Sequence, residues 1–180
     1  MKKDLTHQIT FAGILLAIII VMQIIKNVNA FISGPVINAC MVLAALCIGV
    51  WWGVGFAIGV PLLSLLIASA SPMTSIAYAT YGVATVIVIV GNLIFILSAY
   101  FTRKLKIYYF IPALIIGAVL KWLFMWGGGS LILNKLFIDS LGKLINAVNK
   151  VFSTLQLFSG LISVPLIVLL YEIEKKYLEK

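Results

Sequence analysis

Hydrophobic residues occur along the chain in six long runs, separated by short polar or turn-forming stretches. An α-helix needs about 20 apolar residues to cross the hydrocarbon core of a bilayer, and each run is close to that length. We therefore predict an all-α integral membrane protein, a compact bundle of six transmembrane helices that forms one domain over residues 1–180. The predicted helices cover residues 9–25, 35–50, 53–70, 77–101, 107–126 and 152–171.

The stretch 131–151, before the last run, has a different pattern. Apolar residues recur there at helix-like intervals, and lysine, asparagine and aspartate fill much of the remainder. This pattern predicts an external amphipathic segment on the membrane surface rather than a seventh crossing. We expect the glycines of Gly127-Gly-Gly-Ser130 to end the fifth helix, and Pro72 with its neighbouring serines to separate the third helix from the fourth.

The distribution of charge supports a membrane location. Residues 27–102 contain no Asp, Glu, Lys or Arg, so this stretch cannot form the surface of a soluble domain. The net charge of +8 does not indicate nucleic-acid binding, because the basic residues lie at the ends of the hydrophobic runs. With six crossings, one side holds Lys2, Lys3, Arg103, Lys104, Lys106, Lys175, Lys176 and Lys180, and the other holds Lys26, Lys135, Lys143 and Lys150. The positive-inside rule then predicts a multi-pass protein of the cell membrane with both termini in the cytoplasm.

Polar residues inside the predicted helices are the main clues to function. Gln23, Asn38, Lys121 and Gln156 all fall in the predicted outer third of the bilayer, and Asn92 lies deeper. Because an unpaired amide in hydrocarbon is unfavourable, these groups should pair with one another, with water or with a ligand. Hydrogen bonds that only hold the bundle together are the alternative, but convergence at one depth favours a pocket.

Lys121 has no Asp or Glu within any hydrophobic run as a counter-ion. Its side chain can extend outward to the membrane surface, or it can face a polar cavity and meet an anionic or strongly accepting group of a substrate. Trp122, Trp126, Tyr78 and Tyr81 lie nearby in the predicted bundle. They are candidates either for the wall of such a cavity or for the aromatic belt of the membrane.

Several classes of function lack their sequence signals. The chain has no phosphate-binding loop, no nucleophile with a base partner, and no His/Cys/carboxylate cluster for a metal. An acidic residue that carries protons through the bundle is also missing. We therefore predict that the chain is not an enzyme, binds no metal or cofactor, and takes its energy from partner subunits.

Four short stretches carry a resemblance to a known family. They are Ile32-Ser-Gly-Pro-Val-Ile-Asn38, Val90-Gly-Asn92, Leu120-Lys121-Trp122 and Phe152-Ser-Thr-Leu-Gln-Leu157. Together with the size, the six runs and the predicted orientation, they make the chain similar to the substrate-binding S component of energy-coupling factor (ECF) vitamin transporters. The resemblance extends over nearly the whole chain.

The resemblance implies a subunit that captures a vitamin or vitamin precursor from outside and releases it inward by tilting in the membrane. Its partners would be a transmembrane coupling subunit and two cytoplasmic ATPases. The predicted substrate-binding residues are Asn38, Asn92, Lys121, Trp122, Gln156 and Tyr78.

Gly13 and Ala17 form a small-xxx-small pair, which permits close helix packing. By residue pattern alone the pair fits packing within the bundle. The resemblance instead implies docking to the coupling subunit, although the family has Ala at the first position.

Two alternatives stay open, a scaffold or assembly protein without a ligand and a stand-alone facilitator. The sequence also leaves the vitamin open among pantothenate, pyridoxine, riboflavin and a hydroxymethylpyrimidine.

Overall fold

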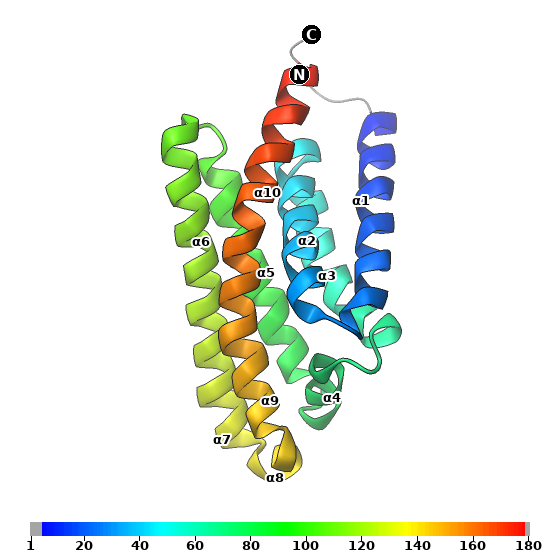
Figure 1. The fold of residues 1–180 in the computed structure, drawn as a ribbon, viewed down its shortest axis with the longest axis vertical. Helices are drawn as coiled ribbons and strands as arrows, with labels where there is room; N and C mark the ends of the chain where they lie inside the picture. Colours follow the sequence, from blue (N-terminus) through cyan, green and yellow to red (C-terminus); the bar gives the residue numbers. More distant parts are fainter. Residues whose placement is uncertain (1–4, 179–180) are drawn as a thin grey trace.

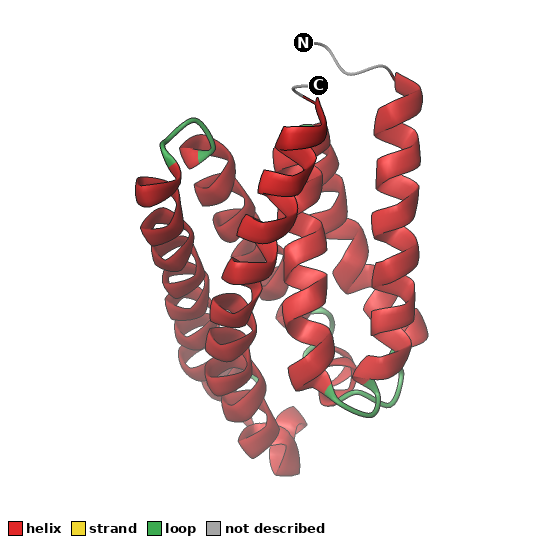
Figure 2. Ribbon diagram, turned by 45° about the horizontal axis from the view of Figure 1, so that its top comes forward, coloured by secondary structure: helices red, strands yellow, loops and turns green. Residues whose placement is uncertain are grey.

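The computed structural model describes residues 5–178, and its helices run side by side with no strand in that range (Figures 1 and 2). Within these residues, six helical stretches are long and apolar enough to cross a membrane. They are Leu5–Lys26, Ala30–Ile48, Val50–Ile67, Val83–Thr102, Ile107–Leu136 and Ile138–Lys176. The prediction of an all-α, multi-pass membrane protein is confirmed at this level. Lys2, Lys3 and Lys180, which entered the orientation prediction, lie outside the described residues.

The first three stretches contain α1 (Leu5–Lys26), α2 (Ala30–Leu43) with the π-helical turn η1 (Ala44–Ile48), and α3 (Val50–Ile67). α2 with η1 is the central element of the bundle. In its most hydrophobic part, 78% of the residues are buried, whereas the corresponding share for α1 is 22%. Small residues such as Ala39, Ala44 and Ala45 let neighbouring helices approach it closely. Cys40 and Cys47 are buried there and form no disulfide.

The predicted fourth helix, 77–101, is wrong at its first end. The structure has two helices there, α4 (Pro72–Ala79) and α5 (Val83–Thr102). Pro72 does not lie in a loop but starts α4, where its missing N–H has no helical partner to lose. Between the two helices, Tyr81 and Gly82 have positive φ angles of 49° and 85°, which end α4 and redirect the chain. Hydropathy did not reveal this corner because both sides of it are apolar.

The α-helical part of the fifth helix ends within one residue of the predicted position 126, but the chain does not leave the helix at Gly127–Ser130 as expected. After α6 (Ile107–Gly127) the chain continues as a π-helical turn η2 (Gly128–Leu133) and α7 (Asn134–Leu136). Glycine is tolerated here because it allows close approach: a Cβ at Gly129 would lie 2.6 Å from Cβ of Phe152.

The stretch 131–151, for which an amphipathic surface segment was predicted, forms a helical hairpin. It continues through α8 (Ile138–Leu141), η3 (Gly142–Leu144), α9 (Ile145–Asn149) and η4 (Lys150–Thr154) into α10 (Leu155–Leu178). Asn134 Nδ2 donates to Asn149 Oδ1 at 3.1 Å and joins the two limbs of this hairpin. Leu133, Leu141 and Val148 are buried between the limbs and α4, which explains the apolar periodicity of the segment.

The start of α1 and the end of α10 lie at one end of the bundle, and α4 with α7 to α9 lie at the other (Figure 1). We call the second end the hairpin end. Two apolar clusters form the core. One is built mainly from α1, α2, η1, α3 and α5, and the other packs the hairpin against α4 and α5.

Candidate functional site

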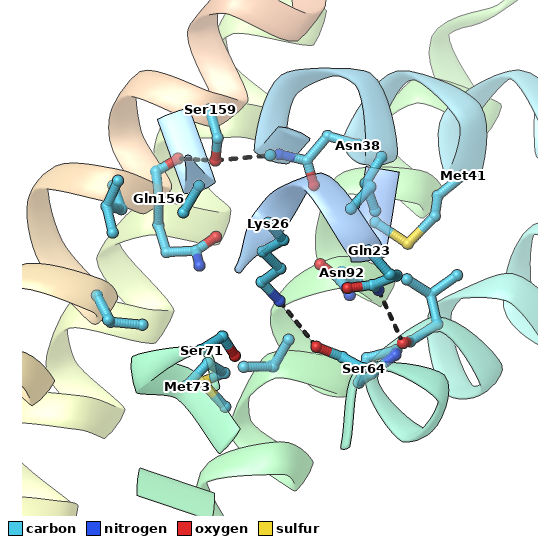
Figure 3. A pocket seen from close by; sticks show the side chains of 18 of the residues that line it. Gln23, Lys26, Asn38, Met41, Ser64, Ser71, Met73, Asn92, Gln156 and Ser159 are labelled. Carbon is cyan, nitrogen blue, oxygen red and sulfur yellow. Dashed lines mark hydrogen bonds between the residues drawn. The ribbon is translucent and has the colours of Figure 1, made fainter. Parts of the chain in front are cut away.

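A cavity of about 130 Å³ lies inside the bundle, bordered by both apolar clusters. All six membrane-length stretches and α4 contribute to its wall. The lining residues are Gln23, Lys26, Ala30, Gly34, Ile37, Asn38, Met41, Val60, Pro61, Ser64, Ser71, Pro72, Met73, Val88, Asn92, Lys121, Val151, Leu155, Gln156 and Ser159. Figure 3 shows polar side chains from different helices pointing into the same space.

Lys121 faces this cavity. It lies on the buried face of α6 at helical spacing from Leu114, Ala118 and Met125, and only 1% of its surface is exposed. Nζ donates to Asn38 Oδ1 at 2.7 Å and lies 5.8 Å from the centroid of the Phe95 ring. The side chain therefore does not extend along the helix to the membrane surface, which answers the question that the sequence left open.

Asn38 links three helices around the cavity. Its Oδ1 accepts from Lys121 of α6, and its Nδ2 donates to Ser159 Oγ of α10 at 3.2 Å. Ser159 Oγ in turn donates to the backbone carbonyl of Gln156 at 3.3 Å. This chain of bonds fixes the orientation of the Asn38 amide, with its oxygen toward the ammonium group.

Lys26 is a second cationic residue in the wall, and it is not among the binding residues predicted from the sequence. It is the last residue of α1, and its Nζ donates to Ser64 Oγ of α3 at 2.9 Å. In the sequence it is explained by its place at the end of a hydrophobic run. The signal that could have found it is its spacing of three residues from Gln23, which places both on one face of α1.

Several amide groups in the wall retain unused hydrogen-bonding capacity. Gln23 Nε2 donates to the Val60 carbonyl at 3.3 Å, whereas its buried Oε1 has no partner. The side-chain amides of Asn92 and Gln156 make no hydrogen bond to any described residue (Figure 3). A buried polar atom such as Gln23 Oε1 normally has a hydrogen-bond partner, so the wall is suited to a polar ligand or to water.

The cavity wall contains neither acidic nor aromatic residues. The acidic residues among residues 5–178 are Asp139, Glu172 and Glu174, and none of them lines it. The two ammonium groups therefore have neutral oxygens as their partners. Apart from its polar groups, the wall is aliphatic, with Met41 and Met73 as its most adaptable side chains.

Two predicted site residues lie outside the cavity. Trp122 is one position beyond Lys121, so it is rotated by about 100° around α6, and it stacks on Trp126 with ring centroids 6.2 Å apart. Tyr78 on α4 is 68% exposed. The geometry therefore corrects the expectation of an aromatic wall, while Asn38, Asn92, Lys121 and Gln156 come together as predicted.

Gly13 and Ala17 lie on the exposed face of α1. A Cβ built at Gly13 meets nothing within 4 Å, so this position does not serve close packing within the described bundle. The pair leaves a shallow surface on which another helix can pack.

The cavity is equipped for binding by charge and hydrogen bonds. Among the described residues, no group of three or more His, Cys, Asp or Glu side chains could hold a metal ion. Comparison of the chain with protein-family models, with curated proteins and with solved structures gave no match.

Proposed function

We propose that this chain is the substrate-capture S component of an ECF-type importer, which binds a small vitamin or vitamin precursor from outside the cell. The observation that carries the proposal is the buried cavity in which Asn38, Asn92, Lys121 and Gln156 meet. These residues come from the four short stretches on which the family resemblance rests.

In this proposal the chain lies in the cell membrane, both termini are cytoplasmic and the hairpin end faces outward. The charge distribution supports this orientation. Arg103, Lys104, Lys106, Lys175 and Lys176 lie near the ends of helices opposite the hairpin. A captured molecule enters near α4 and the hairpin and is released inward when the whole subunit tilts.

Energy for release comes from partners, a transmembrane coupling subunit and two cytoplasmic ATPases. The exposed Gly13 and Ala17 on α1 support a docking role, because they leave room for a helix of the coupling subunit. The chain itself carries no catalytic activity in this proposal.

The cavity also favours this proposal over a structural scaffold. A scaffold gains nothing from a buried Lys121 or from a buried Gln23 Oε1 without a partner, because both are unfavourable in an apolar interior. A stand-alone facilitator needs a route to the other side of the membrane, whereas a tightly packed apolar cluster lies beyond the cavity on the side away from the hairpin.

Co-purification tests the assignment. The tagged chain is extracted from its native membranes in mild detergent, and the captured proteins are identified by mass spectrometry. We expect one integral membrane coupling protein and two nucleotide-binding ATPases. Reconstitution of the complex should give ATP-dependent uptake of the vitamin that the isolated chain binds. Uptake by the isolated chain without ATPases would identify a facilitator. If the chain has no such partners and supports no uptake, the scaffold is the remaining function.

A further inference from the structure

Two lysines face the same cavity but are held at different places in it. Lys26 is bound to Ser64 of α3, and Lys121 is bound to Asn38 of α2. Each ammonium group has three donors, and each makes one hydrogen bond to a described residue. The wall thus presents two separate cationic positions with unused donors.

The charge of these groups is not balanced within the described part of the protein. None of the acidic side chains in residues 5–178 lines the cavity, and neither lysine forms an ion pair with a described residue. Two uncompensated ammonium groups repel each other and lose hydration on burial. A ligand with two negative charges removes both penalties, whereas a singly charged ligand leaves one of them.

The rest of the wall indicates the shape of that ligand. Among residues 5–178, no Phe, Tyr, Trp or His lines the cavity, so no described side chain there can stack on a flat aromatic ring. A cavity of about 150 Å³ holds one benzene molecule, so the 130 Å³ found here suits a short chain and not a fused ring system. Amides such as Asn92 and Gln156 can contact polar groups between the two charged ends.

We infer that the ligand is a short aliphatic dianion, with one carboxylate at Lys26 and the other at Lys121. A backbone of about four to five carbon atoms matches the size of the cavity. This inference rests on the proposed function, since it names the chemical class of the captured substrate. It disfavours riboflavin, pyridoxine and hydroxymethylpyrimidine, which are aromatic and carry no carboxylate, and also pantothenate, which carries only one carboxylate.

Matched ligands test the inference on the full chain in detergent. Succinate and glutarate are compared with their monoamides, with butyrate, and with nicotinate as a one-ring aromatic acid. Thermal unfolding is followed with a maleimide dye, because Cys40 and Cys47 are buried, form no disulfide and become accessible to the dye when the protein unfolds. Dissociation constants come from calorimetric titration. We expect succinate or glutarate to raise the unfolding temperature saturably and to bind at least tenfold more tightly than its monoamide.

Lys26→Gln should abolish that preference, so that the dicarboxylate and its monoamide bind with similar affinity. Lys143→Gln removes the same charge from the exposed hairpin and should behave like the wild type. Equal binding of dicarboxylate and monoamide by the wild type, or a preference that survives in Lys26→Gln, would overturn the inference. If Lys26→Gln does not fold, the wild-type ligand series decides alone.

The outcome is separable from that of the proposed function. If the chain binds a vitamin but shows no preference for dicarboxylates, and ATPases are co-purified with it, the inference is wrong and the proposed S-component function stands. If the chain prefers dicarboxylates but no ATPases are co-purified, the inference stands and the proposed S-component function is wrong.

Discussion

Lys121 Nζ lies 2.7 Å from Asn38 Oδ1, although the two residues are 83 positions apart in the chain. The bond joins α6 to α2 at the wall of the cavity. It gives a buried ammonium group a neutral partner, which holds the group in place without neutralising it. The cation therefore stays available to an incoming anion.

Replacing Asn38 by leucine should destabilise the empty protein. The substitution leaves Lys121 buried without its acceptor, and hydrogen bonds to charged groups contribute about 1.5–3 kcal/mol. We expect a loss of that size in the free energy of unfolding, measured by SDS titration of the purified protein. Ligand binding should also be lost.

A double-mutant cycle with Lys121→Met checks the cause of this loss. Methionine removes the buried charge, so Asn38→Leu should cost less in the Lys121→Met background than in the wild type. Additive effects of the two substitutions would contradict a direct interaction between these side chains.

The sequence predicted the cavity residues more reliably than the local chain path. Asn38, Asn92, Lys121 and Gln156 stood out because a polar group in hydrocarbon is unfavourable wherever the helix points. Lys26 did not stand out, because a lysine at the end of a hydrophobic run already has an explanation in membrane topology. Its role depends on Ser64, which is 38 positions away and reaches it only through the packing of α1 on α3.

The two wrong helix boundaries have a common cause. Hydropathy reports how apolar a segment is, not its backbone angles. Hydropathy therefore does not reveal the corner at Gly82. The glycines of Gly127–Ser130 predict a helix end, but tertiary packing keeps this stretch helical. The prediction of aromatic residues in the wall is wrong for another reason. Trp122 and Tyr78 are close in sequence to residues that line the cavity, but they do not line it themselves.

Gly13→Leu should break docking without harming the fold. Nothing lies within 4 Å of a Cβ at this position, so a larger side chain is accommodated at the membrane-facing surface. In the proposed function it blocks close approach of a coupling-subunit helix. We expect unchanged thermal stability and ligand affinity, with at least a tenfold loss of co-purified ATPases.

Gly13→Ala is the matched control, because alanine is the residue that S components have at this position, and this variant should keep the partners. Retention of the ATPases by Gly13→Leu would show that the coupling subunit docks elsewhere.

Gly53 is a contact point that should not tolerate a side chain. A Cβ there would lie 2.5 Å from Cβ of Ala45 and 3.1 Å from its Cα, so α3 would have to move away from η1. Overpacking of this kind costs about 1–3 kcal/mol. We expect Gly53→Ala to lower the unfolding temperature, measured with the maleimide dye.

Gly59→Ala in the same helix is the control, since its Cβ meets nothing within 4 Å and alanine favours a helix. Equal stability of the two variants would mean that α3 and η1 are less tightly packed than the structure indicates.

Thr80 should control how firmly α4 covers the cavity. Its fully buried Oγ1 donates to the Ile76 carbonyl at 2.8 Å and accepts from the Ala84 amide at 3.2 Å, so one hydroxyl joins the end of α4 to the start of α5. Pro72 and Met73, at the other end of α4, form part of the cavity wall.

Thr80→Val keeps the shape of the side chain but leaves the Ala84 amide without this acceptor. We expect a loss of about 1–3 kcal/mol in the free energy of unfolding. Faster ligand dissociation should accompany it, because a loosened α4 uncovers the cavity more often.

Thr80→Ser retains the hydroxyl and should stay close to the wild type in both measurements. Stopped-flow displacement of bound ligand compares the two variants, and identical dissociation rates would rule out α4 as a cover that this corner restrains.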